Sequence, residues 1–80
     1  MRGEKNVWAI DGKNWRYQTE SLQIIVHHWL GLPREDWFVS CYSIGVDTRE
    51  LTAKKPEDAK FEAMKVVRSH LQKLLAEVAP

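Results

Sequence analysis

The chain has 80 residues, enough for one domain with one hydrophobic core, because two cores would each be too small to bury their apolar surface. Twelve Lys and Arg against eleven Asp and Glu give a net charge of +1, which excludes the strong global field that draws many nucleic-acid binders to phosphate. The single cysteine, Cys41, excludes an intramolecular disulfide, and no apolar run reaches the length of a membrane span. We therefore expect a single cytoplasmic domain over residues 1–80, without a membrane segment and with residues 1–5 flexible.

A sheet is expected over residues 6–51. Asp11-Gly12 lies between two strand-like runs at 7–10 and 14–17, and this dipeptide supplies the positive φ angles of a type I′ hairpin turn. Residues 36–44 are dense in aromatic and β-branched side chains, and Gly45 with Asp47 and Thr48 closes that segment. These patterns predict an N-terminal hairpin and a later strand.

The segment 20–31 fits two structures. Its apolar residues fit a helical stripe, and Gly31 with Pro33 resembles a helix C-terminus. Against this, residues 24–26 form a β-branched run, and the alternation of Leu22, Ile24 and Val26 is typical of a strand. We favour the strand and keep the helix as the alternative.

A long amphipathic helix is expected over residues 56–77. Pro56 suits the first helical position, and Glu57 and Asp58 complement the positive end of the helix dipole. Apolar residues then recur at steps of three and four, and they are Ala59, Ala63, Val66, Val67, Leu71, Leu74 and Val78. The spacing predicts a helix that packs along one stripe.

Together these elements predict an α+β fold: a small antiparallel meander of three to four strands with the C-terminal helix on one face, or a ββαβα order if 20–31 is helical. The face beneath the helix would carry Trp15, Tyr17, Leu22, Ile24, Val26, Trp37, Val39 and Cys41. The opposite face would carry Arg16, Gln18, Gln23, Ile25, His27, Trp29, Phe38, Ser40, Tyr42 and Ile44.

The apolar side chains on that opposite face make a poor surface for water, so something is expected to cover it. It could be covered by other parts of the chain or by a second copy in a homodimer. Alternatively, single-stranded nucleic acid could stack on its rings beside basic groups. The residues that would form this interaction face are Arg16, His27, Trp29, Phe38 and Tyr42.

A basic strip is expected along the first half of the helix, formed by Lys54, Lys55, Lys65 and Arg68. Residues 53–74 resemble the last helix of double-stranded-RNA-binding domains, and this resemblance implies that lysines near the helix start would contact phosphates. A solvated helix face is the simpler interpretation, because exposed lysines are common on helices.

The candidates for catalysis and metal binding are few. His27 and His28 are neighbours in the expected strand and would point to opposite faces, so they would not bind one metal ion together. Cys41 falls on the core face, where a thiol is usually inert, and His70 is expected at the edge of the core with one hydrogen bond. No phosphate-binding glycine loop or hydrolase motif occurs. We expect no enzymatic activity, no metal and no cofactor.

The chain also resembles, in its order of elements, small uncharacterised proteins of bacteriophages and prophages. The pattern comprises a tryptophan-bearing hairpin, the strands at 24–28 and 36–41, the turn at 44–46 and a helix led by residues 57–60. This resemblance implies a compact accessory protein that acts by binding. The sequence therefore predicts a non-enzymatic interaction module that forms a homodimer through its aromatic sheet face, with nucleic-acid binding as the alternative.

Overall fold

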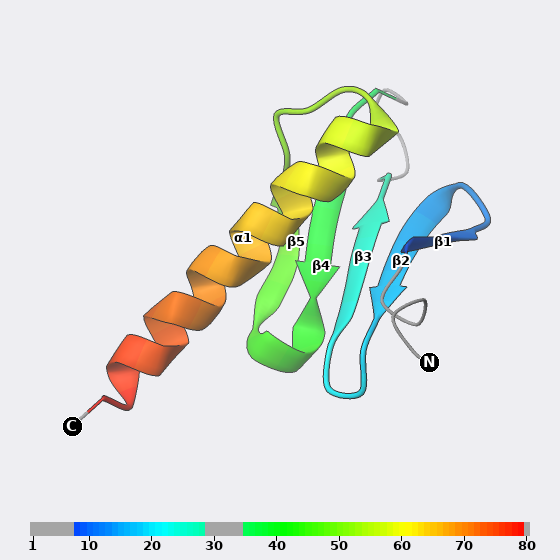
Figure 1. The fold of residues 1–80 in the computed structure, drawn as a ribbon. Coiled ribbons are helices and arrows are strands. Elements are labelled where there is room, and N and C mark those ends of the chain that lie inside the picture. Colours follow the sequence, from blue (N-terminus) through cyan, green and yellow to red (C-terminus); the bar gives the residue numbers. More distant parts are fainter. Residues whose placement is uncertain (1–7, 29–34, 80) are drawn as a thin grey trace.

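The computed structural model describes residues 8–28 and 35–79. Its five strands form one antiparallel sheet in sequential order, followed by one helix on one face (Figure 1). The elements are β1 (Trp8–Asp11), β2 (Asn14–Gln18), β3 (Gln23–His27), β4 (Phe38–Cys41), β5 (Val46–Glu50) and α1 (Pro56–Glu77). The predicted α+β meander with a C-terminal helix is confirmed, with five strands instead of three or four.

The N-terminal hairpin is present, but its turn lies one residue later than predicted. Asp11 still belongs to β1 and pairs with Asn14, which leaves Gly12 and Lys13 as the loop. Of these two loop residues, Gly12 alone has a positive φ, at 67°. A positive φ at the first central position alone is typical of a type II′ turn, whereas type I′ needs it at both.

The strand favoured for residues 20–31 is confirmed over β3, and the helix end that the alternative placed at 31–33 lies outside the described residues. β3 pairs with β2 on one side and with β4 on the other. The turn before β3 is closed by Thr19, whose Oγ1 accepts the backbone N–H of Leu22 at 2.9 Å.

The predicted strand over 36–44 is wrong at its C-terminal end. β4 stops at Cys41, and Tyr42–Ile44 form one turn of 3₁₀ helix that ends at Gly45, whose φ is 89°. This turn reverses the chain into β5, a strand that the sequence analysis missed. As a result, Ile44 packs against the core instead of lying on the opposite face.

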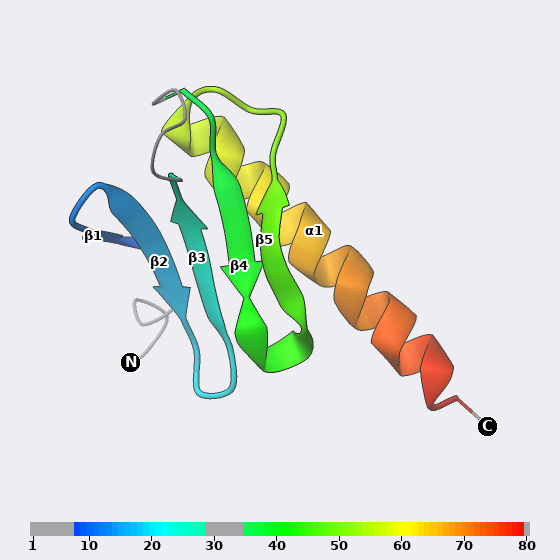
Figure 2. The ribbon, with the colours of Figure 1, turned by 180° about the vertical axis from the view of Figure 1, so that it is seen from behind.

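α1 begins and ends where the sequence predicts, and its small residues set its distance from the sheet. Ala59, Ala63 and Val67 are its buried residues, and they let the helix approach β3 and β4 closely. The helix has 22 residues, about 33 Å at 1.5 Å per residue, whereas a five-residue strand spans about 17 Å. The C-terminal part of α1 therefore projects past β5, beyond the edge of the sheet (Figures 1 and 2).

Candidate functional site

The back of the sheet, the face away from α1, is held together by a hydrogen-bond network centred on Ser40. This side chain is 1% exposed. His27 Nδ1 lies 3.1 Å from the carbonyl oxygen of His28, which can only accept, so Nδ1 carries the proton and Nε2 accepts from Ser40 Oγ at 2.8 Å. Ser40 Oγ in turn accepts the backbone N–H of Thr48 at 3.1 Å. The Ser40 hydroxyl is buried, and it both donates and accepts a hydrogen bond. This arrangement is typical of a structural hydrogen-bond link between strands and not of a nucleophile.

The structure assembles the predicted aromatic interaction face only in part. Arg16, His27 and Phe38 do lie on the back of the sheet, and Arg16 approaches Asp11 at 3.8 Å. Phe38 is only 6% exposed, so its ring is not offered to a stacking base. Tyr42 is 62% exposed but lies in the 3₁₀ turn, past the end of β4. Trp29 lies outside the described residues.

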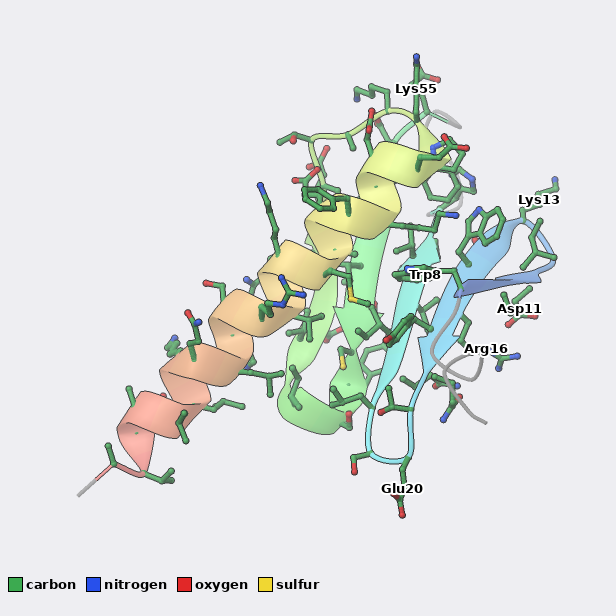
Figure 3. All side chains as sticks on the ribbon, viewed as in Figure 1. Trp8, Asp11, Lys13, Arg16, Glu20 and Lys55 are labelled. Carbon is green, nitrogen blue, oxygen red and sulfur yellow. The ribbon has the colours of Figure 1, made fainter. Side chains whose placement is uncertain are left out.

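The predicted basic strip is present on the surface, but its charges are interleaved with acidic groups. Lys54 Nζ donates to Asp36 Oδ1 at 2.7 Å, and this hydrogen bond raises the pKa of Lys54. Lys65 Nζ lies 5.1 Å from the centre of the Phe61 ring, and Arg68 is exposed. Lys55 lies at the start of α1, at the top of the view in Figure 3, above Asp11 and Arg16.

Glu57 and Asp58 are exposed beside Lys55 in the first turn of α1. A basic surface interrupted in this way has a weak local field for phosphate.

The residues considered for catalysis and metal binding make structural contacts. Cys41 is fully buried in the core. The centres of the His28 and Trp37 rings lie 4.0 Å apart. His70 Nε2 donates to the carbonyl oxygen of Ile44 at 2.7 Å, as expected of a histidine at the core edge. Over residues 8–28 and 35–79, no group of three His, Cys, Asp or Glu side chains is arranged to hold a metal ion. Within the same ranges, no helix is long and apolar enough to span a membrane.

α1 covers the strands at one end of the sheet face on which it lies and leaves the strands at the other end less buried. One row of paired residues runs across this face from Val39 through Val26 and Trp15 to Ile10. Val39 and Val26 are fully buried, Trp15 is half-buried, and Ile10 is 66% exposed. Burial thus falls from the strands beneath α1 towards β1, because α1 passes over β3 and β4 and leaves β1 and β2 beside it (Figures 1 and 2).

The part of this face that α1 does not cross forms a surface that we call the aromatic shelf, defined by Trp8, Ile10, Trp15 and Tyr17. Its three rings pack against the edge of the core, and Ile10 is its exposed member. The rings of Trp8 and Tyr17 lie 5.4 Å apart, and both side chains are half-buried. Lys60 of α1 borders the shelf, with its Nζ 3.8 Å from the centre of the Trp15 ring. The sequence analysis placed Trp15 and Tyr17 beneath the helix. They lie on the correct face, but the path of α1 leaves them only partly covered.

A second apolar surface lies on the part of α1 that projects past the sheet. We call it the apolar end of α1, defined by Leu71, Leu74, Leu75 and Val78. Leu71 is 36%, Leu75 69% and Val78 76% exposed, while Leu74 is half-buried. The sequence analysis placed Leu71, Leu74 and Val78 on the packed stripe of the helix and did not include Leu75. The signal that this end is exposed lay in the lengths of the elements, since the helical periodicity extends much further than a short strand can cover.

Comparison of the chain with protein-family models, with curated proteins and with solved structures found no match.

Proposed function

We propose that this protein is a non-enzymatic interaction module that associates with itself. The observation that carries the proposal is the exposure of the apolar end of α1, where Leu75 and Val78 are each more than two thirds exposed. Burying one such side chain contributes roughly 1.5–3 kcal/mol, so a surface that brings several of them together favours association. A homodimer is the simplest assembly that a chain with surplus apolar surface can form.

The contact surface differs from the one predicted from the sequence. The back of the sheet was expected to supply it, but Phe38 is buried there, and Arg16 and Ser40 are polar. The exposed large apolar side chains lie elsewhere. Leu71, Leu75 and Val78 gather at the end of α1, whereas Ile10 on the aromatic shelf, Phe61 on the first half of α1 and Tyr42 in the 3₁₀ turn are separate from them. The proposed role as a phage- or prophage-type accessory protein is supported by the resemblance in the order of elements alone.

Sedimentation equilibrium over a range of protein and salt concentrations tests the proposal. We expect the wild-type chain to show concentration-dependent association that persists at high salt, because apolar contacts are not screened. Leu75→Glu should abolish the association. Ser69→Glu adds the same charge to an exposed position of α1 away from the apolar end and should leave it intact.

Tyr42→Ala reports on the exposed ring in the 3₁₀ turn after β4, which the sequence analysis had placed on the sheet face. A loss of association in this variant, with Leu75→Glu unaffected, would move the contact to that turn. A wild-type chain that is monomeric at every concentration would overturn the proposal. A nucleic-acid titration that weakens steeply with salt would then favour the alternative function.

A further inference from the structure

α1 covers only part of one face of the sheet. A helix with its side chains is about 10–12 Å wide, and neighbouring strands lie about 4.8 Å apart, so one helix covers two to three strands. α1 contacts β3 and β4, and the described part of the chain contains no other α-helix. The aromatic shelf on β1 and β2 thus lacks the helical layer that covers the neighbouring strands.

The same chain carries a helix segment that has no sheet beneath it. The apolar end of α1 extends past β5, at the edge of the sheet opposite to β1 and β2, which carry the shelf (Figure 1). The distance across the sheet separates the two surfaces within one molecule, so the segment cannot reach its own shelf. A second copy can supply it.

We propose that the aromatic shelf of one copy receives the apolar end of α1 from another copy, an inference that rests on the proposed self-association. The segment would lie over β1 and β2 as the first half of α1 lies over β3 and β4, with its leucines against the tryptophan and tyrosine rings. Charge does not oppose this contact. Lys60 borders the shelf, and the exposed charged groups of the inserted segment are Lys73 and Glu77, which cancel.

The size of the contact predicts its strength. A Trp or Tyr side chain buries about 150–250 Å² in full, and those on the shelf are already half-buried. One contact therefore buries a few hundred Å² per partner, less than the roughly 800 Å² per partner of a stable interface. The association should be weak and strongly dependent on concentration.

A mixing experiment distinguishes this contact from a symmetric contact between two helix ends. Leu75→Glu places a charge in the apolar end of α1 and leaves the shelf intact. Ile10→Glu places a charge on the shelf and leaves the apolar end of α1 intact. Both positions are about two thirds exposed, so both variants should fold, which circular dichroism verifies. Lys13→Gln, in the hairpin loop next to the shelf, changes the net charge by the same −1 as Ile10→Glu and is the matched control, which should associate like the wild type.

We expect each variant alone to sediment as a monomer. In the equimolar mixture, the intact shelf of Leu75→Glu should receive the intact helix end of Ile10→Glu, so the two variants should associate as a pair. If Ile10→Glu associates like the wild type, the shelf does not take part and the inference is overturned, while self-association stands. If the mixture stays monomeric although the wild type associates, the inference also fails. A monomeric wild type removes both the proposed function and the inference.

Discussion

The carboxylate of Glu62 accepts hydrogen bonds from the backbone N–H of Thr52 at 2.9 Å and from its hydroxyl at 3.1 Å, across the connection between β5 and α1. The same carboxylate accepts the N–H of Ala53 at 2.9 Å. Partial burial raises the pKa of Glu62, but the hydrogen bonds from Thr52 and Ala53 outweigh it, so the pKa lies below its usual value of 4.5. This interaction fixes the start of α1 relative to the sheet.

We expect Glu62→Gln to lower the free energy of unfolding by about 1 kcal/mol at pH 7, since an amide accepts fewer and weaker hydrogen bonds than a carboxylate. A carboxylate whose pKa is lower in the folded state than in the unfolded state stabilises the folded state fully at pH values above the unfolded-state pKa. This stabilisation is lost progressively as the pH falls through the folded-state pKa. The difference between wild type and Glu62→Gln should therefore shrink below about pH 4.5. Urea unfolding at pH 7 and pH 3.5 measures it, and a difference that is the same at both values would contradict this account.

Ser40→Ala should be destabilising by about 1–3 kcal/mol, because it removes the partner of His27 Nε2 and of the Thr48 N–H in a buried site. Ser43→Ala is the control, since Ser43 is exposed and contacts only the weakly polar thiol of Cys41, at 3.8 Å. Thermal unfolding followed by circular dichroism compares the two. Equal stability of both variants would show that water replaces the Ser40 hydroxyl.

Gly45→Ala should destabilise the turn between β4 and β5 by roughly 1–2 kcal/mol, because alanine is strained at a φ of 89°. A Cβ here would meet His70 Nε2 at an ordinary 3.7 Å, so the expected effect comes from the backbone and not from a clash. Gly45→Asn tests this distinction, since asparagine tolerates left-handed conformations better. An asparagine variant less stable than the alanine variant would point to steric crowding.

Much of the fold could be predicted from the sequence because its signals are local. Pro56 with the acidic residues after it marks the start of α1, and the alternation of Leu22, Ile24 and Val26 indicates β3. β5 was missed because its sequence, Val46–Glu50, is mostly polar and charged. Its pairing with β4 depends on the Gly45 turn and on the register between Cys41 and Val46, which are not apparent in local composition.

The candidate surfaces could be predicted less well, because they depend on the path of α1 across the sheet. Alternation assigns Trp15 to the face beneath the helix, where it packs against the core, and periodicity assigns Leu71 to the apolar stripe of α1, where it is 36% exposed. Whether such a face is covered depends on which strands the helix crosses and where it leaves the sheet. Those features follow from the packing of Ala59 and Ala63 over β3 and β4, a tertiary relationship that the spacing of residues does not contain.

The close approach of α1 to the sheet gives a last prediction. Ala63 is fully buried between the helix and the sheet, so Ala63→Leu would force three additional carbon atoms into a packed core. Overpacking of this kind is destabilising by about 1–3 kcal/mol, and here it should also push α1 away from β3 and β4. Ala76→Leu, on the exposed surface of the projecting part of α1, is the matched control and should unfold like the wild type. Urea unfolding of both variants measures the difference, and a leucine tolerated at position 63 would mean that α1 is not seated on its alanines.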